Sequence, residues 1–397
     1  MVNNTSITAE KGQPYPDQDV NQISQNGWPV EGLEKRELKE RLPARRKKFT
    51  YFIGIDVSKD KLDYAVFCRK DLLFHQVAAN EPDAILEFVN ELKGIKSFSI
   101  KKALFCMEAT GIYCNHLLTI LDRLQANIAM ENPYHISRSF GLVREKTDKS
   151  DAIRIADYAQ KNGEDLKLWV ARRPVLQHLK NLSTLRARLL TAFNALSTPL
   201  GEQKRFAKKD IQTQAVEMSA GSIKAIKSDL SGVNKAIEKL IRDDDRLKRL
   251  NQLITSVPGV GMITAIQIIL ATNEFNSINN PKKFACYAGV APFKKESGTG
   301  RHRHRVSQMA NKKIKTLLHM CAIAAIIRHE EFTSYYARRT KDNGKPKMAV
   351  INAIKNKLIL RIFACVNQNR VYRKNYQNQN DTNAGGSHFV PCLERCD

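Results

Sequence analysis

Residues 51–70, YFIGIDVSKDKLDYAVFCRK, decide the fold, because two apolar runs flank a short polar turn. Short runs that are rich in aromatic and β-branched residues are typical of buried strands. The segment 71–79, DLLFHQVAA, predicts a third strand immediately afterwards. The sequence therefore predicts a meander of three strands at the start of the ordered chain.

Strands and helices alternate after this meander. Helices are expected over 83–92, 112–124 and 150–160, and strands over 102–109 and 127–132. A meander followed by alternating strands and helices favours an α/β domain with a mixed sheet. We place this domain at residues 50–165.

The rest of the chain is predicted to be mainly α-helical. Residues 166–255 carry apolar residues at spacings of three and four, which predicts long helices in an antiparallel pair or coiled coil, interrupted near Pro199 and Gly201. Residues 256–372 predict a helical C-terminal domain that contains a basic loop over 289–313. The polar segments 1–49, which ends in a basic run, and 373–397 are expected to be disordered.

The charge of the chain points to a polyanionic partner. Its 65 Lys and Arg residues against 40 Asp and Glu residues give a net charge of +25. Clustered positive charge of this size favours nucleic acid, although a basic, merely soluble protein is the plain alternative. We expect a cytoplasmic protein without a membrane partner, because no apolar run reaches the roughly 18 residues needed to cross a bilayer.

Four carboxylates are predicted to share one site. Asp148 and Asp151 lie three residues apart at an expected helix start, so they share one helix face. Asp56 lies within an apolar strand and Glu108 ends another, where a carboxylate must be paired or bind a cation. Oxygen ligands of this kind suit Mg²⁺, and two ions are possible. Lys146 and Lys149 are then expected to face a phosphate backbone.

The C-terminal domain contains two candidate phosphate-binding elements. The turn SVPGVG places Gly259 and Gly261 where backbone amides can approach phosphate, in a helix-hairpin-helix-like element. A plain turn between helices explains it equally well. The loop after it has the composition of a phosphate-binding segment. Its basic residues include Lys294, Lys295, Arg301, Arg303, Arg305, Lys312 and Lys313. Ser297 precedes a glycine in this loop and is a candidate nucleophile, although most loop serines are simply turn residues.

Three segments resemble one protein family. GIDVSKDKLDYAVF, MEATGIYCNHL and KTDKSDAIRIADYA are similar to the DEDD motifs of insertion-sequence transposases of the one-ten and eleven-eleven groups, whose relatives include the Piv-type DNA invertases. The resemblance covers about residues 50–372. It implies a RuvC-like, RNase H-type fold for the first domain and a transposase domain at 256–372. It also implies that Asp56, Glu108, Asp148 and Asp151 hold the metal.

The resemblance further implies that Ser297 is the nucleophile. Since VSQMAN stands where the family more often has a lysine-glycine-asparagine segment, Ser307 remains an alternative and the role of Asn311 stays open. His302, Arg301 or a metal-bound hydroxide are alternative bases for the serine.

The expected activity is DNA recombination through a composite site. The acids hold Mg²⁺ at the scissile phosphate while Ser297 forms a covalent link to element-end or target DNA. The family resemblance implies guidance by a structured noncoding RNA, and recombination of four strands suggests a homodimer or homotetramer in the prokaryotic cytoplasm or nucleoid. The main alternative is a RuvC-like endonuclease or Holliday-junction resolvase that activates water. A nucleic-acid scaffold without activity is a second alternative.

Overall fold

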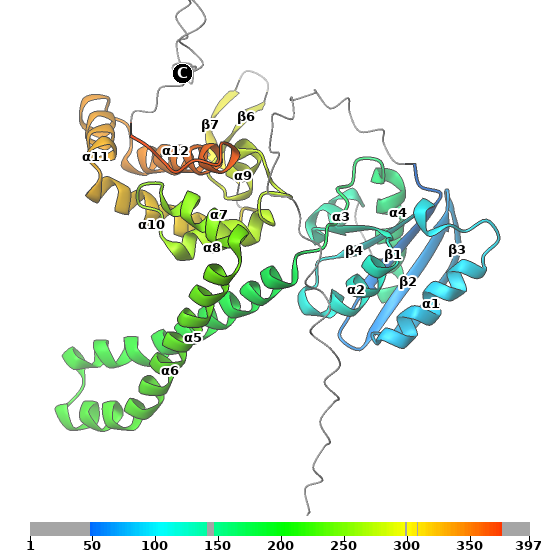
Figure 1. Cartoon of the computed structure of the whole chain (residues 1–397), viewed down its shortest axis with the longest axis horizontal. Helices are drawn as coiled ribbons and strands as arrows, with labels where there is room; N and C mark the ends of the chain where they lie inside the picture. Colours follow the sequence, from blue (N-terminus) through cyan, green and yellow to red (C-terminus); the bar gives the residue numbers. More distant parts are fainter. Residues whose placement is uncertain (1–47, 141–146, 298–299, 308, 375–397) are drawn as a thin grey trace, which may run out of the picture. The chain divides into compact units, whose positions relative to one another are not determined.

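The computed structural model describes residues 48–140, 147–297, 300–307 and 309–374 (Figure 1). The chain divides into two compact units between Trp169 and Val170. The extension predicted at 1–49 lies outside the described residues except for Lys48 and Phe49. The tail predicted at 373–397 does so except for Arg373 and Lys374.

The first unit is built on a five-stranded mixed sheet, as the sequence predicted. The strand order is β3-β2-β1-β4-β5, in which β1 is antiparallel to β2 and parallel to β4. The strands β2 and β3 are antiparallel, and β4 and β5 are parallel. The strand bounds are Tyr51–Val57 (β1), Lys61–Cys68 (β2), Asp71–Ala79 (β3), Ala103–Glu108 (β4) and Asn127–Glu131 (β5).

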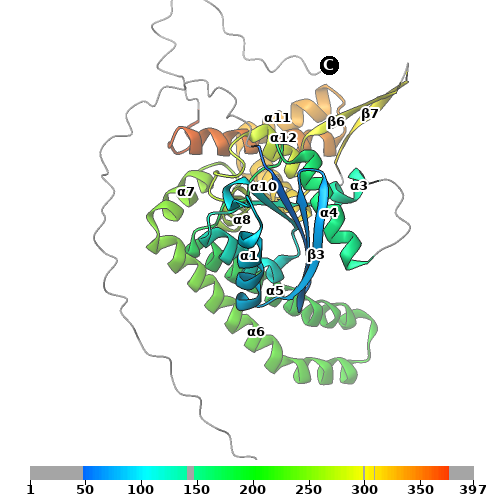
Figure 2. The same cartoon turned by 90° about the vertical axis from the view of Figure 1, so that its right-hand side faces the viewer.

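Helices cover the two faces of this sheet (Figure 2). Alternate residues of a strand point to opposite faces. Ile53 and Ile55 therefore pack with α1 (Pro82–Gly94) and α2 (Asn115–Arg123), which follows a 3₁₀ turn at Gly111–Cys114. Phe52 packs on the other face against α4 (Asp148–Asn162). The short helix α3 (Pro133–Ser139) was not predicted; Asn132 caps it by accepting a hydrogen bond from the Tyr134 amide.

The strand β1 and the helix α4 lie in unusually close contact at Gly54. A Cβ atom at this position would lie 2.2 Å from the Ala156 nitrogen and 2.3 Å from the Ala152 oxygen. Only glycine leaves room for the helix backbone here. This approach brings the start of α4 against the face of the sheet that carries Asp56.

The second unit begins with two long helices, α5 (Pro174–Phe206) and α6 (Lys209–Asp243), which form a hairpin (Figure 1). The interruption predicted near Pro199 and Gly201 is wrong, because α5 continues to Phe206. A proline lacks the donor of one helical hydrogen bond. The helix α5 nevertheless continues past Pro199. The chain reverses instead at Ala207 and Lys208, both of which are extended.

A separate helix, α7 (Asp245–Thr255), follows α6 after a break at Asp244 that the helical periodicity did not reveal. The Asp244 Oδ1 atom accepts a hydrogen bond of 2.8 Å from the Leu247 amide and caps α7. Arg173 donates to both oxygens of Asp244, at 2.8 and 3.0 Å, and to Glu274. Arg173 thereby fastens the first turn of α5 to the rest of the unit.

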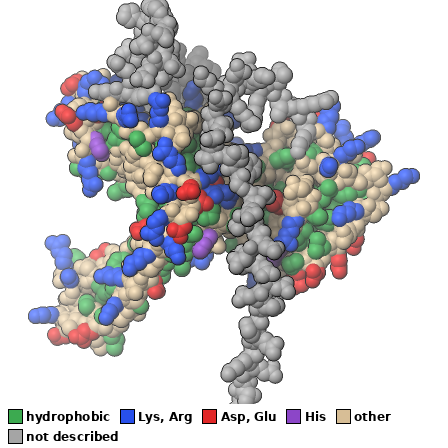
Figure 3. Space-filling view, in the orientation of Figure 1, with side chains coloured by type: hydrophobic (Ala, Val, Ile, Leu, Met, Phe, Trp, Pro, Cys, Tyr) green, Lys and Arg blue, Asp and Glu red, His purple; other side chains and the backbone are tan. Residues whose placement is uncertain are grey.

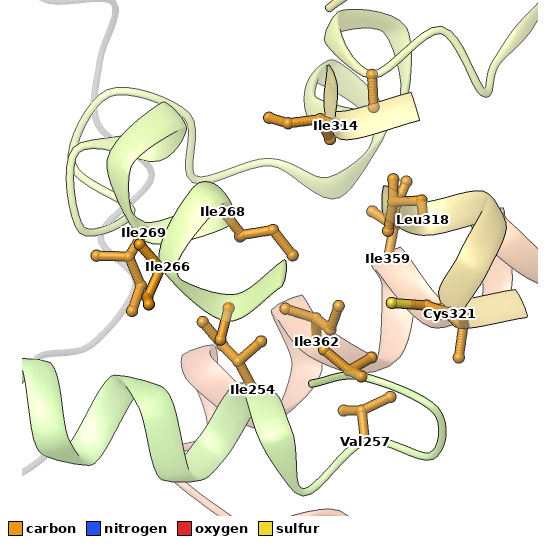
Figure 4. Close-up of a cluster of buried hydrophobic side chains, with 14 of the residues drawn as sticks. Ile254, Val257, Ile266, Ile268, Ile269, Ile314, Leu318, Cys321, Ile359 and Ile362 are labelled. Carbon is orange, nitrogen blue, oxygen red and sulfur yellow. The ribbon is translucent and has the colours of Figure 1, made fainter. Parts of the chain in front are cut away.

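The core of the second unit lies among α7, α8, α10 and α12 (Figure 4). Side chains such as Ile254, Ile266, Leu318 and Ile362 point toward one another there. The remaining helices are α8 (Met262–Thr272), α9 (Pro281–Tyr287), α10 (Lys312–Arg328), α11 (Glu330–Ala337) and α12 (Lys347–Asn367). Short turns of other helix types lie at Ile100–Lys102 and Arg338–Asp342. No helix in the described part of the chain is long and apolar enough to span a membrane.

The predicted basic loop contains a β-hairpin. The strands β6 (Pro292–Ser297) and β7 (Gly300–Val306) pair in antiparallel register, with Ser297 opposite Gly300. The prediction of a loop over this stretch is wrong. Its many charged residues do not show the apolar alternation by which a strand is recognised in a sequence. Ser297 is consequently the last residue of a strand.

Candidate active site

Acidic residues from three adjacent strands lie on the sheet face that α4 covers. Asp56 on β1 is directly opposite Asp63 on β2. Glu108 on β4 follows Met107, the register partner of Ile55, so it neighbours Asp56 across the parallel pair. Since side chains alternate along a strand, these acids share the face of Phe52, which packs on α4. The sheet therefore brings the predicted strand acids together.

The predicted helix acids lie at the start of α4, and neither is used to cap it. Thr147 and Ser150 form a capping box: the Thr147 hydroxyl accepts from the Ser150 amide at 3.1 Å, and the Ser150 hydroxyl accepts from the Thr147 amide at 2.9 Å. The helix dipole favours negative charge in this first turn. The helix dipole thus favours Asp148 and Asp151 here, while the capping hydrogen bonds come from Thr147 and Ser150.

Ion pairs tie these acids to neighbouring cations. The Lys61 Nζ atom lies 2.6 Å from Asp148 Oδ2 and 3.1 Å from Asp63 Oδ2. His75 Nε2 lies 3.1 Å from the other Asp63 oxygen. Arg154 Nη1 donates to Asp151 Oδ1 at 2.8 Å within α4. The first turn of α4 is therefore linked to β2 through Lys61.

The electrostatics show that three of the four predicted acids form one cluster. Burial raises the pKa of Asp56, and the negative charges of Asp151, Asp148 and Asp63 raise it further, while Lys61 opposes them. Like charges disfavour ionisation when they are close. Asp148 and Asp151 therefore lie close enough to act on Asp56, and Glu108 adjoins Asp56 on the sheet.

The chemistry of these donors fits a hard divalent cation. All four predicted ligands are carboxylates. A cation would oppose the burial and the like charges that raise the pKa of Asp56. Within the described ranges, no three His, Cys, Asp or Glu side chains are gathered into a group ready to hold a metal ion. The assignment of Asp56, Glu108, Asp148 and Asp151 as metal ligands therefore stays a prediction.

Sequence reasoning missed three charged residues on this face. Asp63 is 4% exposed and lies opposite Asp56. Glu131 pairs in register with Glu108 and contacts His135 at 3.2 Å. Lys61 bridges Asp63 and Asp148. The signal that locates Asp63 is the short turn after β1, which fixes the hairpin register.

The predicted basic residues fall into three groups. Lys149 is exposed in the first turn of α4, whereas Lys146 lies outside the described residues. Lys312 and Lys313 are the first residues of α10. The pKa of Lys313 is lowered mainly by burial and also by the positive charge of Arg186. The others occupy backbone positions on β6 and β7, namely Lys294, Lys295, Arg301, Arg303 and Arg305. Figure 3 shows Lys and Arg side chains over the described surface of the helical unit.

Ser307 and Asn311 have local structural roles. The Ser307 hydroxyl accepts a hydrogen bond of 3.2 Å from the Met309 amide. Asn311 caps α10 through the Ile314 amide at 3.0 Å and donates from its side chain to the Tyr287 hydroxyl at 2.9 Å. These contacts hold the segment after β7 against α9.

The two predicted glycines differ in their surroundings. Gly259 has a φ of 78°, and a Cβ there would lie 2.5 Å from the Cys321 oxygen and 2.9 Å from the Ala325 nitrogen. The close packing of this residue on α10 therefore requires glycine. Gly261 has open space where a Cβ would lie. Both glycines line a hollow of 690 Å³ together with Arg328 and Lys374.

Comparison with known proteins defines the class first. Residues 53–202, which include all four predicted acids, match a family model described as a transposase. A pilin gene-inverting protein of Moraxella bovis is 25% identical over 332 residues, covering 81% of this chain and 98% of that protein. Its counterpart in Moraxella lacunata is 24% identical with the same coverage. The chain is thus a DNA transposase or recombinase enzyme.

The family follows from the second unit. Residues 251–337 match the model described as the transposase IS116/IS110/IS902 family. The chain belongs to this family of insertion-sequence transposases, which confirms the resemblance in its sequence motifs. An uncharacterized protein of insertion element IS116 from Streptomyces clavuligerus is 24% identical, over 44% of this chain and 40% of that protein.

Solved structures with some likeness include RuvC of Thermus thermophilus. It is 12% identical, with a TM-score of 0.23, and the match covers 30% of this chain and 99% of that chain. The same values hold for that RuvC in complex with a Holliday junction substrate.

Proposed function

We propose that the protein recombines DNA through a divided active site, in which the acids of the first unit hold Mg²⁺ and Ser297 of the second unit is the nucleophile. The observation that carries the proposal is the meeting of Asp56 with Asp148 and Asp151 on one face of the sheet. Carboxylates that repel one another within a basic protein are suited to a cation that works on a polyanion. Family membership supports DNA as the substrate.

The covalent step conserves the phosphodiester bond energy. The Ser297 hydroxyl loses its proton, its oxygen forms a bond to phosphorus, and one bond from phosphorus to a deoxyribose oxygen breaks. The leaving oxygen takes up a proton and becomes a free hydroxyl group. A bound Mg²⁺ would supply electrostatic stabilisation of the charge that develops on the phosphate. Resealing is the same exchange in reverse, so no nucleoside triphosphate is consumed.

The backbone around Ser297 supports this role. Ser297 ends β6 opposite Gly300, at the tip of a two-stranded hairpin. Its strands carry five of the predicted basic residues, and positive charge favours the approach of a phosphate. Ser307, whose hydroxyl accepts a hydrogen bond from the Met309 amide, remains the alternative nucleophile.

A structured noncoding RNA is proposed as the guide, on the strength of family membership. If base pairing supplies the sequence specificity, the protein needs few residues that read bases, as in other RNA-guided systems. The net charge of +25 suits a partner of this size. We further propose that the active assembly is a homodimer or homotetramer, since four DNA strands must be cut.

The test is a search for a covalent adduct. The protein is incubated with junction DNA of its element, the noncoding RNA and Mg²⁺, and the products are separated on a denaturing gel. We expect an adduct with wild type and Ser307→Ala, and none with Ser297→Ala or Asp148→Ala. Omission of the RNA should abolish it. Clean cleavage without an adduct in both wild type and Ser297→Ala would identify a metal-dependent endonuclease that activates water instead.

A further inference from the structure

Lys61 holds a position between two acidic groups that belong to different elements. It opens β2 on the same face as Asp63, two residues later, and its ammonium reaches Asp148 on α4 at 2.6 Å. The ammonium is thus a cation already placed among carboxylates that repel one another. Its positive charge also opposes the rise in the pKa of Asp56.

Asp63 gives Lys61 a second, fixed partner. The side chain of Asp63 is almost fully buried, and its two oxygens are used separately: one contacts His75 and the other contacts Lys61 at 3.1 Å. Asp148 differs, because its side chain is 55% exposed. When Asp148 moves away, Lys61 therefore still has a buried counter-ion.

We propose that Lys61 is the resident counter-cation of the acid cluster, and that Asp148 exchanges Lys61 for a divalent cation when the site is loaded. Lys61 is a positioning residue in this scheme and is retained by Asp63. The inference rests on the proposed use of a divalent metal by the four acids. It accounts for the finding that the described acids are close enough to repel one another without being gathered as a metal-ligand set.

The positive charge of Lys61 should weaken the binding of a divalent cation, and this effect can be measured. An ion pair at a partly exposed site contributes little to stability, and a positive charge near a divalent cation repels it. Removal of the Lys61 charge should therefore tighten metal binding, whereas loss of an ordinary scaffold contact would weaken it. The direction of the change separates the two roles.

The experiment measures Mn²⁺ binding to the full chain without nucleic acid, by electron paramagnetic resonance of the free ion. We expect Lys61→Gln to lower the dissociation constant about three- to tenfold. Lys61→Arg, which keeps the charge, should stay within about twofold of wild type. The matched control is Lys59→Gln, which removes an equal charge from an exposed residue in the adjoining turn and should also stay within about twofold. Circular dichroism confirms that each variant is folded.

Several outcomes overturn the inference. If wild type binds Mn²⁺ and Lys61→Gln binds it equally or more weakly, the exchange is wrong while the metal site stands. If Lys59→Gln or Lys61→Arg tightens binding as much as Lys61→Gln, the effect does not come from the contact with Asp148. If neither wild type nor Lys61→Gln binds Mn²⁺, the proposed metal use fails and the inference fails with it.

Discussion

Asp56 on β1 and Asp63 on β2 are directly opposite each other in the antiparallel register, so two carboxylates project from neighbouring strands on one sheet face. Like charges in this relationship destabilise a sheet. Lys61 forms an ion pair with Asp63, which also contacts His75. Asp56 instead lies among acids, and burial together with their charges raises its pKa. The first unit therefore retains an electrostatic cost at the place where a cation is proposed to bind.

Replacement of Asp56 by Asn should stabilise the metal-free protein at pH 7. Because the folded pKa of Asp56 is raised, its contribution to stability is present below the unfolded value of about 3.9 and is lost as the pH rises through the folded pKa. We expect Asp56→Asn to raise the free energy of unfolding by up to about 1 kcal/mol at pH 7, with no gain near pH 3. Urea unfolding at both pH values measures this. A loss of stability at pH 7 would contradict it.

Replacement of Asp63 by Asn should have the opposite effect. The variant keeps the shape of the side chain but loses the charge that pairs with Lys61 and His75 in a buried position. We expect the first unit to lose about 1–3 kcal/mol of unfolding free energy. Asp60→Asn, in the exposed turn before β2, is the matched control and should change stability by less than about 0.5 kcal/mol.

A methyl group at Gly54 should disrupt the first unit. In Gly54→Ala the new carbon would lie 2.2 Å from the backbone of α4, so the helix must move away from β1. We expect loss of more than about 3 kcal/mol, seen as a lowered melting temperature or as insoluble protein. Gly232→Ala, with open space around an exposed helical site on α6, should instead raise stability by up to about 1 kcal/mol. Equal melting temperatures for the two variants would refute the close contact.

Lys355 should be replaceable by Met with a gain in stability. It lies on α12 and is 4% exposed. Its pKa is lowered mainly by burial and also by the positive charge of Lys315. Since the unfolded chain binds the proton more tightly, wild-type stability should rise as the pH increases from the folded pKa toward about 10.4. Lys355→Met should add about 1 kcal/mol at pH 7, and less near pH 10.

Thermal unfolding at the two pH values tests this prediction. Lys347→Met, at the exposed start of the same helix, is the control and should change the unfolding free energy by less than about 0.5 kcal/mol. A gain for Lys355→Met that is equally large at pH 10 would show that charge is not its cause.

The sequence predicted the first unit well because its strands are short apolar runs with clear turns. The residues of β1, β2 and β4 are buried almost throughout, so their pattern is visible without the structure. The break at Asp244 could not be predicted from local sequence, because Asp244 pairs with Arg173, which lies 71 residues away from it. Arg173 also bonds to Glu274, 101 residues from Arg173. The hairpin of β6 and β7 was not predicted, because its strands are rich in charged residues and lack an apolar pattern.

The acid site was predictable in part. Acids within apolar strands and at a helix start were evident, and the family motifs assigned them to one site. The contribution of Lys61 was not, since a lysine in a polar turn is usually solvated and only the approach of α4 to β1 places Asp148 beside it. Whether Ser297 acts with these acids stays a prediction.

The anchoring of Arg173 has a consequence for how the gene can be divided. The Trp169 amide bonds to the Ile128 carbonyl at 2.7 Å in the first unit, and Arg173 is fixed within the second, so residues 170–172 lie between the two anchors. Each hydrophobic cluster among the described residues belongs to one side of this point. A split of the coding sequence at 170–172 would therefore yield two polypeptides with intact cores, one with the acids and one with Ser297, and such halves could be exchanged between related elements.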